Sequence, residues 1–228
     1  MSSKKSNQNI EIINETPDRF DNFYKIAIIG DCEVGKTALV KTIVNIPFPE
    51  RYFSTDGQVI SNIFIKIKDK TLKLELSDMT GNKGYENLYD IYLKNSSLAI
   101  LVYDITNRAS FRNIESWLQK IESIPKVILV GNKIDLDEIP DGRQVDFEEG
   151  QNKVESKIKN FIECSAKTNT NVKEIFIEAA KLLYNSPELL ETRNEDNIIS
   201  EVESEVVGEN SEKTKTIEKE NNCGPCCM

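Results

Sequence analysis

The stretch YKIAIIGDCEVGKTALV, residues 24–40, decides the fold. It opens with a short apolar run of the kind that forms a buried strand, over residues 24–30. A loop with a glycine at each end follows, and a helical pattern then covers residues 36–44. The loop, GDCEVGKT, matches GxxxxGK[ST] in the strand-to-helix context that gives this motif its meaning.

This loop predicts a phosphate site. Its glycines let the backbone wrap closely around phosphate groups, while successive N–H groups and the helix N-terminus supply positive potential. We expect Lys36 to reach the β- and γ-phosphates and the Thr37 hydroxyl to ligate Mg²⁺. The other expected contacts in the loop are Gly30, Asp31, Cys32, Glu33, Val34 and Gly35. Alone, the motif indicates a nucleotide but not which base.

A second motif, NKID at residues 132–135, follows the apolar run VILVG. An aspartate carboxylate can accept from both N1–H and the exocyclic amine of guanine, a pair that adenine lacks. We therefore expect Asp135 to select guanine, Asn132 to bond the other edge of the base, and the Lys133 stem to cover the ring. An isolated NKxD is also compatible with an ordinary strand-to-loop turn.

The tripeptide SAK follows a further strand pattern about thirty residues later. Backbone N–H groups of Ser165 and Ala166 could hold the guanine O6, with Lys167 on the opposite face of the base. The order of phosphate loop, NKID and SAK makes the guanine interpretation much stronger than any one motif does.

Apolar runs alternate with helical patterns along the chain, which indicates a largely parallel sheet covered on both faces. The runs flanking Asp69-Lys70 predict a hairpin that adds one antiparallel edge strand. We expect an α/β fold with a mostly parallel six-stranded sheet. Its predicted strands cover residues 24–30, 62–68, 71–77, 98–104, 127–131 and 160–164, and its predicted helices 36–44, 110–121, 147–156 and 172–183.

Composition limits the functional classes. The chain has 228 residues, a formal net charge of −9 and no histidine, which argues against a nucleic-acid partner and removes histidine catalysis and most zinc sites. No apolar run is long enough to cross a membrane, and the first twenty residues lack the apolar core of a signal peptide, so secretion is not expected. Three of the five cysteines lie in the last six residues, which favours a modified tail over a disulfide framework.

Taken together, residues 22–184 resemble a small GTPase of the Ras superfamily, specifically its Rab branch. GDCEVGKT is similar to the Rab loop GDSxVGKS/T, YFSTDGQVI (52–60) to YxSTIGVDF, and DMTGNKGYENL (78–88) to DTAGQERFRSL. YDITNRASFRNIESWLQKI (103–121) and FEEGQ (147–151) also look like Rab segments. The resemblance implies a P-loop NTPase G domain, a doubly wound sheet with nucleotide at the carboxyl ends of its strands.

The resemblance also implies roles for residues outside the two nucleotide motifs. Thr55 would ligate Mg²⁺ and sense the γ-phosphate, and the Gly81 backbone would also sense the γ-phosphate. Asp78 would act on Mg²⁺ through water, and the Phe48 ring would pack near guanine. The implied catalytic set is Asn82, Lys36, Thr55 and Gly81. Two switch segments, near residues 50–60 and 79–92, would be ordered by the γ-phosphate and released on its loss.

The chain departs from the family pattern at its hydrolysis position. Asn82 stands where the family has the glutamine that orients the attacking water, and asparagine is one methylene shorter. Because phosphoryl transfer depends on positioning, we expect slow intrinsic GTP hydrolysis. GTPase-activating proteins of the Rab type resemble enzymes that supply both an arginine and a glutamine, so turnover could still be rescued. Glu33 lies beside the phosphates and would repel them only if it points inward.

Further departures concern partner recognition. Asp56 replaces a usual isoleucine, Ser77 a tryptophan and Ile60 a phenylalanine, which leaves Tyr92 from the aromatic patch that reads effectors. We therefore expect unusual effectors. The other implied partners are an exchange factor, a GTPase-activating protein and a GDP dissociation inhibitor, acting on a monomeric core.

Beyond the G domain, assigned to residues 23–185, we expect a flexible extension over residues 1–22 and a disordered acidic tail over residues 186–228. Residues 186–222 carry eleven Asp/Glu against four Lys/Arg, a net charge of −7. The ending GPCCM resembles double-cysteine Rab termini, which implies geranylgeranyl groups on Cys226 and Cys227, with Cys223 as a further acylation candidate. Two lipids give stable anchoring, here to the cytoplasmic face of intracellular membranes.

These features favour a prenylated, Rab-like switch in vesicle traffic that cycles between cytoplasm and membrane. A Ras- or Rho-type signalling GTPase is the nearest alternative. A membrane-tethered scaffold that holds GTP with little turnover stays open because of Asn82 and Glu33. NKID and SAK together argue against an adenylate-type kinase or ATPase.

Overall fold

The computed structural model describes residues 10–47, 55, 57–140, 142–186 and 189. The strands are β1 (Ile10–Ile13), β2 (Asn22–Ile29), β3 (Gln58–Ile67), β4 (Lys70–Met79), β5 (Ser96–Asp104), β6 (Val127–Asn132) and β7 (Ile158–Glu163). The helices are α1 (Lys36–Ile43), α2 (Tyr89–Leu93), α3 (Arg108–Arg112), α4 (Ile114–Lys120), α5 (Phe147–Gln151) and α6 (Val172–Tyr184). Two short 3₁₀ helices, η1 (Lys83–Leu88) and η2 (Ile134–Leu136), complete the described elements.

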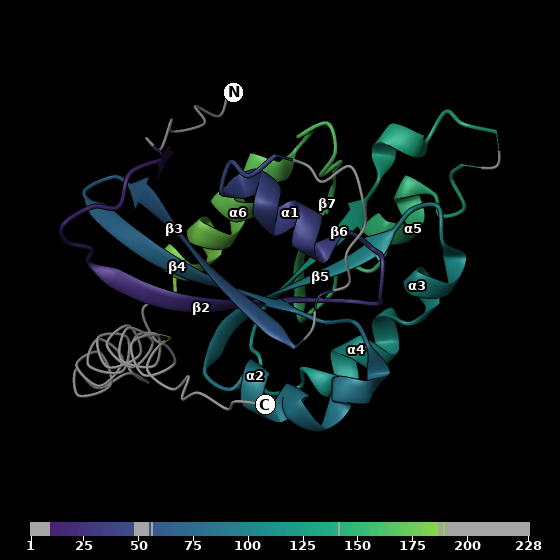
Figure 1. Ribbon diagram of the computed structural model, residues 1–228, viewed down its shortest axis with the longest axis horizontal. Helices are drawn as coiled ribbons and strands as arrows, with labels where there is room; N and C mark the ends of the chain where they lie inside the picture. The colour runs from purple at the N-terminus through teal and green to yellow at the C-terminus, as the bar shows by residue number, and fades with distance from the viewer. Residues whose placement is uncertain (1–9, 48–54, 56, 141, 187–188, 190–228) are drawn as a thin grey trace, which may run out of the picture. The chain divides into compact units, whose positions relative to one another are not determined.

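The strands form one sheet in the order β1-β3-β4-β2-β5-β6-β7 (Figure 1). Strands β4, β2, β5, β6 and β7 pair in parallel, whereas β3 pairs antiparallel with both β4 and β1. The predicted α/β class, the mostly parallel sheet and the antiparallel hairpin at one side are confirmed.

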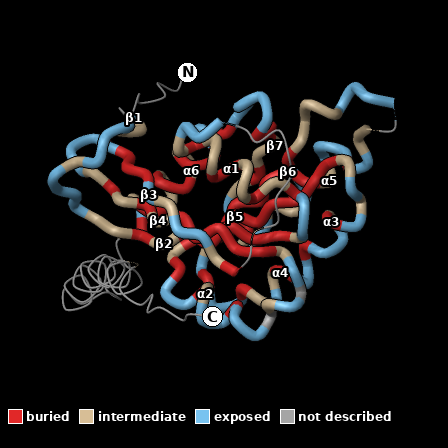
Figure 2. The backbone as a smooth tube through the Cα atoms, viewed as in Figure 1, coloured by how far each residue is buried: buried red, intermediate tan, exposed pale blue. Residues whose placement is uncertain are grey.

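Helices cover both faces of the sheet because its central strands are apolar on both sides. In β2, Ile26 and Ile28 face the cluster that includes α1 and α6, while Ala27 and Ile29 face the cluster that includes α2 and α4. Figure 2 shows the resulting buried centre, with exposed segments confined to the periphery. The alternation fixes the register, since a slip of one residue would exchange the two faces.

The predicted six strands are corrected to seven by β1. Residues 10–13, assigned to a flexible extension, pair with residues 64–67 of β3, with Ile12 opposite Ile65. Ile10 and Ile12 pack against the cluster beneath α6. A four-residue strand in a polar stretch gains its stability from this pairing and burial, so the first 22 residues are not all a free extension.

Two predicted helices differ from those in the structure. The pattern over residues 110–121 divides at Asn113 into α3 and α4, and the side chain of Asn113 turns to bond Asp31. The helix predicted over residues 147–156 ends at Gln151, because Gly150 and Asn152 favour helices weakly.

The end of the folded domain also differs slightly. Ser186, assigned to the tail, is only 2% exposed, and its hydroxyl donates to the Leu182 carbonyl. The remaining tail, with Cys223, Cys226 and Cys227, lies outside the described residues. In the part of the chain that is described, no helix combines the length and apolar character needed to span a bilayer.

Candidate nucleotide-binding site

The phosphate loop joins β2 to α1 at the carboxyl edge of the sheet. Gly30 and Gly35 have φ values of 137° and 97°, in the region that favours glycine. A Cβ on Gly30 would lie 2.1 Å from the Val102 carbonyl oxygen, and one on Gly35 would lie 2.2 Å from Asn132 Nδ2. Both glycines are therefore required by contacts with β5 and β6, not only by the turn itself.

Lys36 is buried inside this loop. It is 6% exposed, and its Nζ donates to the carbonyl oxygens of Gly30 at 2.9 Å and Asp31 at 2.6 Å. Burial lowers the pKa of Lys36 to about 8, an effect only partly opposed by Asp78. A nearby anion such as a phosphate would favour the charged form of Lys36 and raise its pKa again, so the geometry fits the predicted phosphate contact.

The residues expected to hold Mg²⁺ lie together. The hydroxyls of Thr37 and Thr55 are 2.6 Å apart, although Thr37 lies in the first turn of α1 and Thr55 precedes β3. Oδ1 of Asp78 is buried and has no hydrogen-bond partner among the described residues. Burial raises the pKa of Asp78, against the effects of Thr37 and Lys36. Hydroxyl and carboxylate oxygens are what Mg²⁺ prefers, so these residues fit the ion.

Asn132 joins three loops of the site. Its Nδ2 donates to the Val34 carbonyl at 2.9 Å, and its Oδ1 accepts from the Ala166 amide at 3.1 Å and from the Cys164 thiol at 3.5 Å. It is 2% exposed, and Val34 takes one of the two N–H groups of its Nδ2. The sequence predicts that Asn132 bonds the base, and in the structure its amide also ties the phosphate loop to the loop of Ala166.

Asp135 lies beside the SAK tripeptide, as the guanine interpretation requires. Ser165 Oγ donates to Asp135 Oδ1 at 2.7 Å, and Lys167 Nζ lies 3.8 Å from Asp135 Oδ2. The Ser165 backbone is held in turn by a bridge to Thr170. Asp135 is thereby oriented by Ser165.

Lys133 is fixed by a residue that the motif analysis did not single out. The Lys133 backbone is left-handed, with φ 73°, and its Nζ lies 2.7 Å from Asp104 Oδ2 at the end of β5. The other oxygen of Asp104 accepts from the amide and hydroxyl of Thr106. The signal was present, because Asp104 ends a buried strand of a parallel sheet, where ligand-binding residues gather.

A second feature that the sequence analysis missed is an ion-pair cluster that joins the two base loops. Arg143 donates to Asp137 at 2.6 Å and, through both terminal nitrogens, to Glu163 at 2.8 and 2.9 Å. Asp137 follows NKID, and Glu163 precedes the residues Cys164 and Ser165. No sequence motif marks this cluster, because Arg143 lies 6 residues from Asp137 and 20 residues from Glu163.

The segment that carries the hydrolysis residue packs on the phosphate loop. A Cβ on Gly81 would lie 2.4 Å from the Asp31 carbonyl carbon and the Cys32 nitrogen. Asn82 is exposed, and its Oδ1 accepts from the Gly84 amide at 2.9 Å. The Asn82 side chain is therefore folded back on its own turn.

The other residues predicted to contact the nucleotide differ in orientation and exposure. The Asp31 carboxylate turns away from the loop toward α4, while Cys32 and Glu33 are exposed and Val34 is buried. Phe48, Asp56 and most of the segment near residues 50–60 lie outside the described residues.

This arrangement of loops defines the class of protein, and comparison with known proteins agrees. Residues 25–185 match the Ras family, and the chain belongs to it as a Rab-like small GTPase. It is 38% identical to Ras-related protein RABF2a of Arabidopsis thaliana over 163 residues, which cover 70% of this chain and 80% of that protein. It is also similar to Ras-related protein RABF2b of the same plant, with 36% identity over 77% of this chain and 86% of the relative. Ras-related protein Rab-1 of Theileria parva shares 36% identity over 72% and 76% of the two chains.

Proposed function

We propose that this protein is a membrane-anchored molecular switch that binds GTP and GDP with Mg²⁺ and acts in intracellular vesicle traffic. The observation that carries the nucleotide part is the Asn132 side chain, which ties Val34 of the phosphate loop to Ala166 of the base loop. A site in which one buried amide couples these two loops suits a ligand with phosphates at one end and a base at the other.

Guanine would be selected by Asp135. Its carboxylate is oriented by Ser165 and would accept from N1–H and the exocyclic amine of guanine, a pair of donors that adenine lacks. At the other end, Lys36 would bind the β- and γ-phosphates, and the hydroxyls of Thr37 and Thr55 would hold Mg²⁺ with Asp78 acting through water. When bound, the ion would neutralise charge on the phosphates.

Hydrolysis would be slow without a partner. Efficient attack requires a side-chain amide that positions water, and Asn82 is short and turned to Gly84 in the structure. A GTPase-activating protein that supplies its own arginine and glutamine would restore turnover. The same observation favours the second candidate function, a tethered scaffold that keeps GTP with little turnover.

The partner surface would lie beside the nucleotide. Val59, Ile60, Leu88 and Ile91 are large apolar side chains that are between 36% and 65% exposed. They belong to or adjoin the segments whose order would depend on the γ-phosphate, so effectors, an exchange factor and a GDP dissociation inhibitor would read the nucleotide state there. Ile60, which stands where the family carries a phenylalanine, supports the expectation of unusual effectors.

Anchoring would come from geranylgeranyl groups on Cys226 and Cys227, and the protein would cycle between the cytoplasm and the cytoplasmic face of intracellular membranes. The intact mass of protein made in a eukaryotic host tests this directly. Two added geranylgeranyl masses support the anchor, and an unmodified terminus contradicts it.

The nucleotide function is tested by chromatography of the nucleotide released from purified protein, followed by a single-turnover hydrolysis time course. Bound GDP with measurable turnover supports the switch. Retained GTP with no turnover supports the scaffold. Adenine nucleotide, or none after loading with GDP and Mg²⁺, would overturn the proposal.

A further inference from the structure

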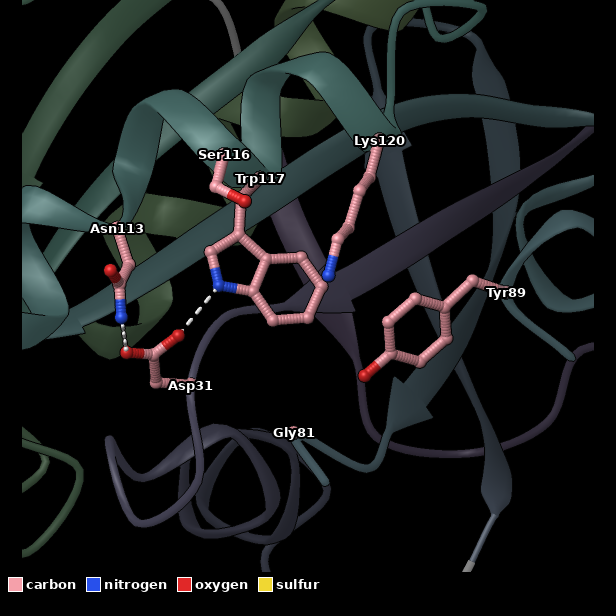
Figure 3. A pocket seen from close by; sticks show the side chains of 7 residues that line it. All are labelled: Asp31, Gly81, Tyr89, Asn113, Ser116, Trp117 and Lys120. Carbon is pink, nitrogen blue, oxygen red and sulfur yellow. Dashed lines mark hydrogen bonds between the residues drawn. The ribbon is translucent and has the colours of Figure 1, made fainter. Parts of the chain in front are cut away.

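The carboxylate of Asp31 is held by α4 and by Asn113, the residue just before that helix. Asn113 Nδ2 donates to Asp31 Oδ2 at 2.7 Å, and Trp117 Nε1 donates to Asp31 Oδ1 at 2.8 Å. Figure 3 shows both bonds, one from Asn113 at the junction of α3 and α4 and one from Trp117 in α4. Each oxygen thus has its own donor, and the side chain is directed to α4 instead of the phosphates.

The indole of Trp117 also contacts the segment that carries the hydrolysis residue. Its ring lies 5.5 Å from that of Tyr89, and Lys120 Nζ lies 4.9 Å and 5.4 Å from the two ring centroids, a favourable cation–π arrangement. The Tyr89 hydroxyl donates to the carbonyl oxygen of Thr80 at 3.1 Å and reaches that of Asn82 at 3.5 Å. Trp117 therefore contacts Asp31 with its N–H and Tyr89 with its ring.

The phosphate loop and the segment after β4 also contact each other directly. Gly81 packs directly on the Asp31–Cys32 peptide, where a Cβ would lie within 2.4 Å of backbone atoms. Asp31, Gly81, Tyr89 and Trp117 surround a pocket of about 100 Å³, which Asn113, Ser116 and Lys120 also line (Figure 3). The phosphate loop and the segment after β4 are thus joined twice, once by backbone packing and once through Trp117.

We propose that Asp31, Trp117 and Tyr89 form a positioning cluster that orders residues 81–93 against the phosphate loop and so sets the rate of GTP hydrolysis. The inference rests on the proposed function. None of the three side chains is directed at the nucleotide; each acts through another residue. Asp31 fixes the indole, the indole fixes the Tyr89 ring, and the Tyr89 hydroxyl holds the carbonyls on both sides of Gly81.

The structure explains why the link to Asp31 depends on a hydrogen bond and not on shape alone. Trp117 is 6% exposed, and its N–H loses its partner if Asp31 loses its carboxylate. A buried N–H without an acceptor is costly, so the ring should move and release Tyr89. Trp117→Phe keeps an aromatic ring beside Tyr89 but removes the N–H, which isolates the contribution of the bond.

The experiment compares wild type with Asp31→Ala, Trp117→Phe, the double variant and Tyr24→Phe, each loaded with a non-hydrolysable GTP analogue and Mg²⁺. Tyr24 is a matched control because it is a buried aromatic residue in the cluster on the other face of the sheet. Hydrogen exchange of amides 81–93 is measured, together with nucleotide dissociation and single-turnover hydrolysis of GTP.

We expect each single variant to exchange amides 81–93 about tenfold faster and to hydrolyse GTP about tenfold more slowly, with nucleotide dissociation changed less than about twofold. The double variant should match Asp31→Ala, because Asp31→Ala already removes the Trp117–Asp31 bond that Trp117→Phe removes. Asp31→Asn keeps an acceptor for the indole N–H and should recover most of the wild-type exchange and rate.

Unchanged exchange in Trp117→Phe would overturn the cluster. So would equal effects in Tyr24→Phe, or effects of Asp31→Ala and Trp117→Phe that multiply in the double variant. These outcomes leave the proposed function intact, since they require a protein that binds guanine nucleotide. Failure of wild type to load the analogue would overturn the proposed function, and this inference with it.

Discussion

Asn132, the last residue of β6, donates from its side chain to the backbone carbonyl of Val34 in the phosphate loop at 2.9 Å. The same amide accepts from the backbone N–H of Ala166 at 3.1 Å. Replacement by alanine would leave two buried backbone groups unpaired, at about 1–3 kcal/mol each. We expect Asn132→Ala to accelerate GDP dissociation by roughly 30- to 1000-fold, equivalent to about 2–4 kcal/mol. Stopped-flow release of a fluorescent GDP analogue measures this rate.

Asn160→Ala is the matched control for this change. Asn160 is a partly buried asparagine on β7 whose side chain accepts from the neighbouring Phe161 amide. GDP dissociation from this variant should stay within about twofold of wild type, because surface changes away from such bridges are small. If Asn132→Ala released GDP no faster than the control, its bridging role would be wrong.

The positions of the nucleotide loops could be predicted from the sequence because their chemistry is local. The motif around Lys36 predicts which residues contact phosphate. Because the motif lies between a strand and the helix that follows it, the phosphate loop is predicted at the carboxyl edge of the sheet. Asp135 and Ser165 follow β6 and β7, and parallel neighbours bring their carboxyl ends together. These residues meet as expected because sheet topology alone is sufficient to place them.

The contacts that support the site could not be predicted in the same way. Trp117 lies in an amphipathic pattern in which an aromatic residue signals burial, and nothing in the pattern indicates that its N–H faces Asp31. The motif of Asn132 predicts a bond to the base, and nothing in it indicates that the same amide also bonds Val34 and Ala166. Strand β1 is missed because four residues within a polar stretch gain their order from a partner fifty residues away.

Strand β1 makes a test of that pairing possible. Ile12 is partly buried against the core, whereas its neighbour Glu11 is exposed. We expect Ile12→Ala to lower the free energy of unfolding by about 1–2 kcal/mol, less than a fully buried isoleucine because only part of its surface is removed from water. Urea unfolding of the nucleotide-loaded protein measures the change.

Glu11→Ala serves as the control for Ile12→Ala and should change the free energy of unfolding by less than about 0.5 kcal/mol. A free N-terminal segment would give the same small value for both variants. That result would contradict the assignment of β1 to the sheet.

Arg143 provides a prediction with a pH dependence. It lies between Asp137 and the mostly buried Glu163, and its removal would leave Glu163 without its partner. We expect Arg143→Ala to lower the free energy of unfolding by about 1–3 kcal/mol near neutral pH. The pair of Arg108 and Glu149 is more than a third exposed at both ends, so Arg108→Ala should cost less than about 1 kcal/mol.

The sign of the pH effect follows from Asp137. Hydrogen bonds from Arg143 hold the pKa of Asp137 below its usual range. This carboxylate therefore contributes stability above its unfolded pKa of about 3.9, and the contribution is lost as the pH falls through the lower folded pKa. The difference between wild type and Arg143→Ala in urea unfolding should shrink below about pH 4. A difference that grew on acidification would contradict this assignment.

The Asn82 side chain supplies the prediction most specific to this chain. Its Oδ1 accepts from the Gly84 amide at 2.9 Å, and the side chain is one methylene shorter than glutamine. Asn82→Gln would lengthen the amide and favour release from this turn, so that it can orient a water molecule beside the γ-phosphate. We expect the single-turnover rate of GTP hydrolysis to rise by about tenfold, with GTP affinity unchanged, because only the positioning of water improves. Asn87→Gln makes the same chemical change at an exposed position in the same segment and should leave the rate at its wild-type value. Equal rates for wild type and Asn82→Gln would show that asparagine positions water adequately, and slow turnover would then need another cause.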